Sequence, residues 1–281
     1  MARVTSLFTF SDKVNIPYYE YPSKVKTDSV MLCIHGLTSE MEHLFTFAEK
    51  LSGKLDVDVH LPILRGYTSF ETGVGDLPEK NKYDSDLKEM INELAQEYKH
   101  IYLMGHSIGA ANVMRYFLEE PHYKVRSFFL VSPFLHPSLK VSRDQKEDNG
   151  GDDFYEVFYT RAVMLRMLDR FNIQVFSQKP VVKIPMREIP YEPDSATVPY
   201  TLSYRLITSR FITKPGILKN PDFSRFNVFI GNNDEVIDGL KFQDIWEKNT
   251  GGKVTLLEKE DHNRVLYSPL FLEEVGQTIK S

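Results

Sequence analysis

The 281-residue sequence predicts an α/β protein with a mostly parallel central sheet and helices on both faces. Strand patterns alternate with helical patterns along most of the chain, which indicates βαβ units and a parallel sheet. Several strand patterns are continuous apolar runs, which are typical of strands buried on both faces. With 42% hydrophobic and 26% charged residues, the composition is that of an ordinary globular domain.

Two alternating segments, Val4–Phe10 and Asn15–Tyr21, open the chain and predict antiparallel strands at a sheet edge. The alternation of strand and helix follows, with Gly53 expected to stop the first helix. The expected strands are Ser29–His35, Asp56–Leu64, His100–His106 and Val125–Ser132, and the expected helices are Ser39–Leu51, Asp84–Tyr98 and Gly109–Glu119.

The alternation breaks between Pro137 and Val198, where a polar run and a proline-rich piece replace it. An insertion between two βα units that leaves the sheet intact predicts a lid, not a second domain. We therefore expect a core domain of residues 1–136 and 199–281, with a lid insertion of residues 137–198 after the sixth strand. Beyond it we expect helices at Tyr200–Thr213, Leu240–Asn249 and Pro269–Lys280, and strands at Phe226–Gly231 and Lys253–Glu258.

Charge and cysteine usage exclude several classes of function. The 34 Lys and Arg against 39 Asp and Glu leave a net charge of −5, which argues against binding to a nucleic-acid backbone. The single cysteine, Cys33, excludes an intramolecular disulfide and a thiolate zinc site, and we interpret it as a buried hydrophobe. Met1–Lys13 has no signal-peptide core, no run approaches a membrane span of ~18 apolar residues, and Asp144–Asp153 lacks a calcium-loop pattern. We expect a cytoplasmic protein without a metal or an integral membrane segment.

The segment G-H-S-I-G, Gly105–Gly109, joins a predicted strand to a predicted helix. Two glycines remove side chains from a sharp strand-to-helix turn, which lifts the Oγ of Ser107 out at the carboxyl end of the sheet. The alternative is a glycine-softened turn with an incidental serine. The strand–turn–helix context favours Ser107 as a nucleophile.

A nucleophilic serine needs a base, and the base needs an orienting acid. If both follow the serine, with the acid first, three histidines qualify: His122, His136 and His262. Only His262 is predicted in the loop after the last strand, at the carboxyl edge of the sheet. It is therefore the expected base.

The acid is expected in G-N-N-D-E-V-I-D, directly after the preceding strand. Asp234 lies three residues past the strand-ending Gly231 and is favoured. Glu235 is expected to point the other way, and Asp238 to cap the next helix. Both remain alternatives.

A tetrahedral intermediate also needs donors for its oxyanion. The strand-to-helix turn Gly105–Gly109, which we call the elbow, supplies the backbone N–H of Ile108, at the positive end of the following helix. The loop L-C-I-H-G-L after the first parallel strand is expected to supply the N–H of Leu37, because Gly36 allows a tight turn. We expect His35 to hydrogen-bond within that loop.

Taken together, the segments L-C-I-H-G-L, L-P-I-L-R-G-Y, G-H-S-I-G, G-N-N-D-E-V-I-D and E-D-H resemble the α/β-hydrolase superfamily, and within it the monoacylglycerol-lipase and carboxylesterase type. The resemblance implies an α/β-hydrolase fold, Ser107 as nucleophile, Asp234 as acid, His262 as base, and Leu37 and Ile108 as oxyanion donors. Where that group commonly has R-G-x-G, this chain has Arg65-Gly66-Tyr67-Thr68, a departure that puts the conformation of this loop in question.

The expected function is a serine hydrolase without a cofactor, cleaving a monoacylglycerol or another short-to-medium acyl ester through an acyl-enzyme. The alternatives are a thioesterase, an amidase or peptidase, or an acyltransferase with the same triad. A non-catalytic binding protein of this fold is a further alternative, although such proteins usually lack a triad member.

Within the insertion, Phe154–Arg170 predicts a helix that is apolar around much of its circumference. Its apolar side chains either pack on the core, line an acyl pocket above Ser107, or form a homodimer contact. Arg161 falls within the apolar arc and needs a partner, either an acidic side chain or an anionic group of the substrate. The candidate substrate-binding residues are Phe154, Phe158, Met164 and Leu165.

Overall fold

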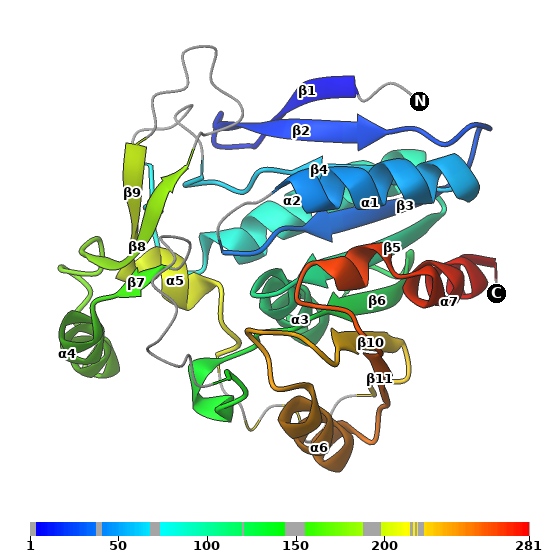
Figure 1. Cartoon of the computed structure of the whole chain (residues 1–281). Coiled ribbons are helices and arrows are strands. Elements are labelled where there is room, and N and C mark those ends of the chain that lie inside the picture. Colours follow the sequence, from blue (N-terminus) through cyan, green and yellow to red (C-terminus); the bar gives the residue numbers. More distant parts are fainter. Residues whose placement is uncertain are drawn as a thin grey trace.

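The protein is built around an eight-stranded sheet, as a computed structural model shows (Figure 1). Its strand order is β1-β2-β4-β3-β5-β6-β10-β11. The two pairings of β2, with β1 and with β4, are antiparallel, and every other neighbouring pair is parallel. This confirms the predicted, mostly parallel sheet with an antiparallel edge. The structure describes residues 4–37, 41–67, 74–119, 121–143, 155–187, 198–213, 216, 218 and 222–280.

The strands and helices of the central unit lie close to their predicted positions. The strands are β1 (Val4–Thr9), β2 (Asn15–Tyr21), β3 (Ser29–Ile34), β4 (Asp58–Pro62), β5 (His100–His106), β6 (Val125–Val131), β10 (Phe226–Gly231) and β11 (Val254–Leu257). The helices are α1 (Met41–Lys54), α2 (Lys82–Glu97), α3 (Gly109–Glu119), α6 (Gly239–Thr250) and α7 (Pro269–Lys280). Gly53 does not stop α1, which runs on to Lys54, because one glycine weakens a helix without ending it.

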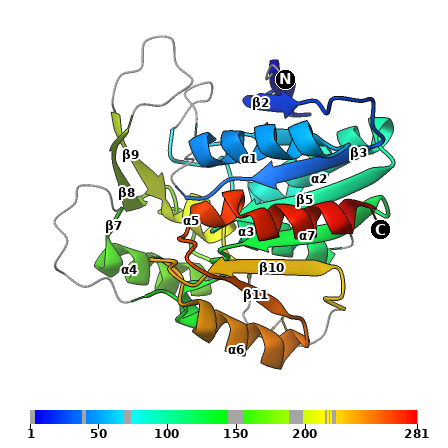
Figure 2. The same ribbon diagram turned by 45° about the vertical axis from the view of Figure 1, so that its right-hand side comes forward.

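Helices cover both faces of the sheet. In two views α1 and α7 lie together on the near face, and α2 and α3 lie behind (Figures 1 and 2). Phe271 of α7 stacks on Phe47 of α1 at 5.6 Å and meets Phe229 of β10 edge-on at 4.9 Å between ring centroids. The near-face helices therefore share one apolar layer with β10, the strand next to the β11 edge of the sheet.

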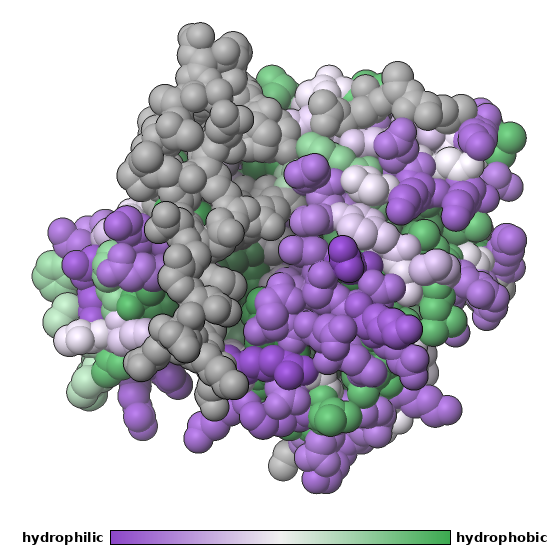
Figure 3. Space-filling view, in the orientation of Figure 1, coloured by the Kyte–Doolittle hydropathy of each residue, from purple (hydrophilic) through white to green (hydrophobic). Residues whose placement is uncertain are grey.

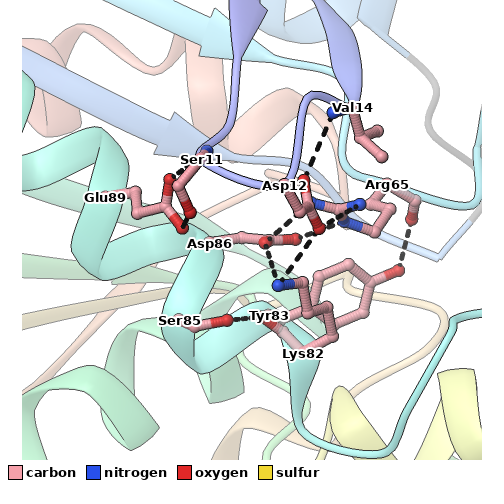
Figure 4. Close-up of polar contacts among 9 residues, drawn as sticks. All are labelled: Ser11, Asp12, Val14, Arg65, Lys82, Tyr83, Ser85, Asp86 and Glu89. Carbon is pink, nitrogen blue, oxygen red and sulfur yellow. Dashed lines mark hydrogen bonds and ion pairs between the residues drawn. The ribbon is translucent and has the colours of Figure 1, made fainter.

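The N-terminal hairpin is tied to α2 by a cluster of charges, of which Arg65 and Asp86 are buried (Figure 4). The guanidinium of Arg65, just past β4, donates to both carboxylate oxygens of Asp86 at 2.9 and 3.1 Å. It also lies 3.1 Å from Asp12 in the β1–β2 turn, and Lys82 lies 3.3 Å from the same carboxylate. Two carboxylates and two cations thus neutralise one another where the hairpin turn meets α2.

Between β6 and β10 the chain forms a second, smaller sheet with strand order β7-β8-β9. The elements of this segment are η1 (Pro137–Leu139), β7 (Glu156–Val157), α4 (Tyr159–Arg170), β8 (Pro180–Arg187), β9 (Val198–Ser203) and α5 (Tyr204–Ser209). We call residues 155–187 and 198–203 the cap.

Two helix predictions in this region are wrong in part. The helix expected from Phe154 begins at Tyr159, because pairing of β7 with β8 holds Glu156 and Val157 extended. The helix expected from Tyr200 is a strand as far as Ser203, because β9 pairs antiparallel with β8, and only α5 beyond it is helical. Phe154 itself lies outside the described residues.

Several apolar side chains of α4 are exposed, between the exposed Arg161, Arg166 and Arg170. Met167 and Phe171 are 62% and 74% exposed, whereas Leu165 is the one α4 residue in the core. In the space-filling view, hydrophobic surface appears at the left edge of the molecule, where Figure 1 places this helix (Figure 3). The predicted apolar helix therefore buries only a narrow part of its circumference. Among the described helices, none has the length and hydropathy needed to cross a membrane.

Candidate active site

Ser107 occupies the turn between β5 and α3 in a left-handed backbone conformation, with φ of 54°. Its N–H donates to the carbonyl of Val131 on the neighbouring strand at 2.9 Å, and its carbonyl accepts from Phe134 at 3.0 Å. Few non-glycine residues adopt positive φ, so a serine held there indicates a turn that its surroundings enforce.

The two glycines of the motif are required by close backbone packing. A Cβ on Gly105 would come within 2.5 Å of Ala110, and one on Gly109 within 2.3 Å of the Ile34 carbonyl oxygen. Neither contact can be relieved by a side-chain rotation, because the opposing atoms belong to the backbone. The elbow is therefore packed directly against the end of β3.

His262 and Asp234 form a buried pair beyond the ends of β11 and β10. The His262 Nδ1 lies 3.0 Å from each carboxylate oxygen of Asp234, so Nδ1 carries the proton and donates. Asp234 is fully buried and also accepts from the N–H groups of Val236 and Ile237 at 2.9 and 2.7 Å. Burial alone would raise the pKa of Asp234, but the bonds to His262 and Ile237 outweigh it and leave the pKa below its usual value.

The two alternative acids accept hydrogen bonds from backbone N–H groups and not from the His262 imidazole. Asp238 caps α6, accepting from the N–H of Lys241 at 3.1 Å, as the sequence predicts. Glu235 does not point away from the site: its Oε2 accepts from the backbone N–H of His262 at 3.1 Å. Of the three, only Asp234 contacts the imidazole.

Two further residues hold the His262 backbone, and sequence reasoning missed both. Its carbonyl accepts from the His106 Nε2 at 3.0 Å and from the Ser132 Oγ at 3.1 Å. Burial lowers the pKa of His106 to about 3, so this ring stays neutral with its proton on Nε2. Ser132, like Ser107, has positive φ (46°). No local sequence signal marks these contacts, because they form only when β5, β6 and the last loop meet.

One expected oxyanion donor belongs to the elbow and the other to a loop that passes close to it. Ile108 follows Ser107 directly, and the loop carrying Leu37 passes close by, since a Cβ on Gly36 would lie 3.4 Å from the Ser107 Cβ. In the described part of the chain, neither the Leu37 nor the Ile108 N–H donates to another residue. His35 hydrogen-bonds within its own loop, as expected, through Nδ1 to the Gly36 carbonyl at 2.7 Å.

The other two histidines after Ser107 lie in different surroundings. His122 accepts from the N–H of Lys124 at 3.2 Å, and His136 accepts from that of Ser138 at 3.0 Å. Each bond is local to its own turn. Among the described residues, neither histidine contacts Asp234.

The expected substrate-binding residues of the cap differ in exposure. Leu165 is buried, Phe158 is half-buried, and Met164 is 53% exposed. Arg161 is exposed, donates to the Pro180 carbonyl at 2.7 Å and lies over the Phe158 ring at 4.9 Å. Within the described residues Arg161 has no acidic partner, and a backbone carbonyl and an aromatic face are its contacts instead.

In the part of the chain that the structure describes, no cluster of three or more His, Cys, Asp or Glu residues could hold a metal ion. Cys33 is buried in β3, and burial raises the pKa of its thiol well above the usual value. The thiol is therefore kept protonated at neutral pH.

The strand order, with one antiparallel edge and a serine elbow after β5, defines the class of protein: a serine hydrolase of the α/β-hydrolase fold. The chain belongs to the family described as serine aminopeptidase, S33, whose model matches residues 25–256. Its similarity to individual proteins is more distant.

An uncharacterized abhydrolase domain-containing protein of Dictyostelium discoideum is 28% identical over 144 residues, a match that covers 50% of this chain and 14% of that protein. A thermostable carboxyl esterase from Bacillus coagulans is similar in structure, with a TM-score of 0.68 at 14% identity, covering 100% of this chain and 98% of the other. A soluble variant of monoglyceride lipase from Saccharomyces cerevisiae has a TM-score of 0.67 at 15% identity, covering 100% and 94%. At these identities the structural likeness shows the fold alone.

Proposed function

We propose that the protein hydrolyses carboxylic esters through an acyl-enzyme, with Ser107, His262 and Asp234 as the catalytic triad. The observation that carries the proposal is the buried pair of His262 and Asp234, with Nδ1 3.0 Å from both carboxylate oxygens, at the same sheet edge as the Ser107 elbow. A neutral imidazole whose Nδ1–H is held by a carboxylate has its Nε2 free to accept a proton.

In the proposed reaction, the Ser107 Oγ attacks the acyl carbon while the His262 Nε2 takes its proton. The protonated imidazole then gives this proton to the leaving alcohol, and the C–O bond of the ester breaks. Water repeats the cycle on the acyl-enzyme and releases the carboxylic acid. Asp234 stays ionised throughout and stabilises the imidazolium, in keeping with its lowered pKa.

The negative charge of the tetrahedral intermediate would be bound by the N–H groups of Leu37 and Ile108. Neither N–H donates to another described residue; Ile108 follows Ser107 in the elbow after β5, and Leu37 lies past the end of β3, which pairs with β5. The removal of one such donor typically costs 10²–10³-fold in rate.

The acyl group is proposed to be of short-to-medium length, as in a monoacylglycerol. The solved structures that support this, a carboxyl esterase and a monoglyceride lipase, are similar in fold. We also propose that residues 137–198 act as a lid over a core of residues 1–136 and 199–281, with Phe158, Met164 and Leu165 as the described candidates for contact with the acyl chain. A homodimer through the exposed face of α4 stays a prediction.

A second candidate function follows from the family description, which is that of an aminopeptidase. The same triad would then attack an amide carbonyl, and His262 would protonate a leaving amine instead of an alcohol. Thioesters and acyl transfer would use the same residues.

A fluorophosphonate probe and a substrate panel test the proposal. The wild-type protein should be labelled, Ser107→Ala should not, and p-nitrophenyl butyrate should be hydrolysed faster than butyryl thioesters and aminoacyl p-nitroanilides. Labelling without turnover of any ester would contradict the proposed substrate class. Failure of the probe to label Ser107 would contradict the nucleophile.

A further inference from the structure

Arg210, directly after α5, is a buried cation without a carboxylate partner among the described residues. Its side chain is 0% exposed, and its guanidinium lies over the rings of Tyr67 and Tyr83, at 5.5 and 5.6 Å from their centroids. The Nη1 donates to the Tyr67 hydroxyl at 3.2 Å, whereas Nε has no hydrogen-bond partner within the described residues. Burial of a guanidinium without an anion costs stability, which directs attention to the contacts that this side chain does make.

Arg210 also contacts the loop that carries the proposed oxyanion donor. Its Nη2 donates to the His35 carbonyl. That carbonyl oxygen also lies against the elbow, since a Cβ on Gly109 would come within 2.6 Å of it. Arg210 therefore holds the backbone by a hydrogen bond two residues before Leu37, at the place where the loop contacts the elbow.

The next carbonyl along the loop is held by the imidazole of His35. Because the Leu64 N–H donates to His35 Nε2 at 3.0 Å, the ring proton must be on Nδ1, which donates to the Gly36 carbonyl at 2.7 Å. The Gly36 carbonyl and the Leu37 N–H belong to one planar trans peptide and point in opposite directions. Fixing the carbonyl on the ring thus directs the Leu37 N–H away from the ring.

We propose that Arg210 is a positioning residue of the oxyanion hole, which acts by fixing the His35–Leu37 loop through the His35 carbonyl. This inference rests on the proposed function of Ser107 and Leu37. Two successive carbonyls of the loop are then held, that of His35 by Arg210 and that of Gly36 by the His35 ring. The single flexible position between them, Gly36, is left with little freedom to turn the Leu37 N–H.

The charge of Arg210 supports this arrangement. Burial, together with the nearby Arg210 cation, lowers the pKa of His35 to about 3. If the ring were protonated, its Nε2–H would point at the Leu64 N–H, and two donors would then face each other without an acceptor. The positive charge of Arg210 therefore helps to keep His35 in the one protonation state that suits both of its hydrogen bonds.

Tyr67, in the loop after β4, is the x residue of the R-G-x-G pattern, and its ring and hydroxyl form one side of the Arg210 site. The departure itself, Thr68, lies outside the described residues. The Tyr67 ring also meets the His35 imidazole edge-on at 4.8 Å. The loop after β4 thus contributes directly to the surroundings of both positioning residues.

The test compares Arg210→Met with Arg205→Met, a matched control on α5 whose arginine pairs with Asp76 away from the elbow. With p-nitrophenyl butyrate, Arg210→Met should lower kcat about 10- to 100-fold with KM within about threefold, because the loss falls on the transition state. The inhibition constant of a butyl trifluoromethyl ketone, whose serine adduct carries the oxyanion, should rise by the same factor as kcat/KM falls. Arg205→Met should change neither.

Each outcome decides the inference. A folded Arg210→Met variant with kcat and ketone affinity within twofold of wild type would overturn it, and so would a loss confined to KM. If Arg210→Met does not fold, Arg210→Lys is measured instead, because it keeps the charge but loses the fork that spans two acceptors. In Arg210→Lys, kcat/KM and the affinity for the ketone should fall by the same factor, and this factor should be smaller than for Arg210→Met. Unchanged ketone affinity would overturn the inference. Wild-type protein without ester hydrolysis, or a fully active Ser107→Ala, would instead refute the proposed function.

Discussion

Asp234 holds the imidazole of His262 by both carboxylate oxygens, each 3.0 Å from the Nδ1. The same carboxylate accepts two backbone N–H groups from the loop that follows β10. The Asp234 carboxylate is therefore held by its own loop as well as by the histidine. Rotation of the imidazole would deprive its Nδ1–H of both carboxylate acceptors.

Replacement of Asp234 by asparagine should slow ester hydrolysis on the order of 10⁴-fold. An amide can donate to Nδ1 and so favours the wrong imidazole tautomer, with the proton on Nε2. Asp238→Asn should cost less than threefold, because Asp238 caps α6. Steady-state kinetics of the two purified variants, with folding checked by circular dichroism, measures the difference. The opposite ranking would move the acid to Asp238.

Glu235→Gln should reduce kcat by a few-fold only. The glutamine carbonyl can still accept from the His262 N–H, but the bond loses its charge assistance. Glu235→Ala, which removes the acceptor, should reduce kcat by about tenfold, with KM unchanged. Equal kcat values for wild type and Glu235→Ala would show that His106 and Ser132 suffice to hold the histidine loop.

Gly109→Ala should destabilise the protein by more than ~4 kcal/mol or prevent folding, because the new methyl group meets backbone atoms of β3. Gly53→Ala is the matched control. It lies within α1 with nothing within 4 Å of the added carbon, and it should leave stability unchanged or raise it by up to ~1 kcal/mol. Urea unfolding followed by tryptophan fluorescence measures both. A normally stable Gly109→Ala variant would contradict the close packing of the elbow.

Stability should fall as the pH drops below about 6.5. Burial lowers the pKa of His35 and His106 to about 3 and that of His60 to about 4. In the unfolded chain these rings titrate near 6.5, so between pH 6.5 and about 4 the unfolded state binds more protons and is favoured. Each histidine contributes a slope of roughly 1.4 kcal/mol per pH unit in that window.

The variant His60→Asn isolates one of these contributions. The amide replaces the ring Nδ1 that pairs with the Tyr18 hydroxyl at 3.0 Å, but it does not titrate. The slope of unfolding free energy between pH 6 and 5 should therefore decrease by about one third, in urea titrations at matched ionic strength. An unchanged slope would show that His60 is protonated in the folded state at these pH values.

The cap should influence acyl-chain preference through Phe158. If this residue lines the acyl pocket, each buried methylene contributes roughly 0.8 kcal/mol. For p-nitrophenyl esters from acetate to decanoate, kcat/KM should then rise by up to about fourfold per methylene until the pocket is full. Phe158→Ala should flatten the profile, whereas Phe171→Ala, at a position 74% exposed, should not. A profile that falls from acetate and is the same in all three proteins would show that the Phe158 region merely packs.

The sequence was most informative where structure is local. The period of apolar residues predicted every strand of the central sheet, and the elbow glycines marked Ser107, because a strand followed by a tight turn and a helix leaves its mark in consecutive residues. The cap strands were not predicted, because β8 begins at Pro180 and β9 begins at Val198 beside Pro199. Proline at the start of a segment suggests a loop, and only the pairing of β8 with β9 shows that these segments are strands. Arg210, Ser132 and Glu235 were missed as partners of the site for the same reason. Each touches a residue that only the completed sheet brings near.

The contact between His106 and the His262 carbonyl joins positions that lie 156 residues apart in the chain. Ribosomes add ~5–20 residues per second, so the nucleophile side of the site is made roughly 8 to 30 seconds before the base. During that interval the elbow lacks the loop that carries His262. With the proposed triad, the nascent chain therefore cannot form an acyl-enzyme from cellular esters until the segment around residue 262 has left the ribosome and docked.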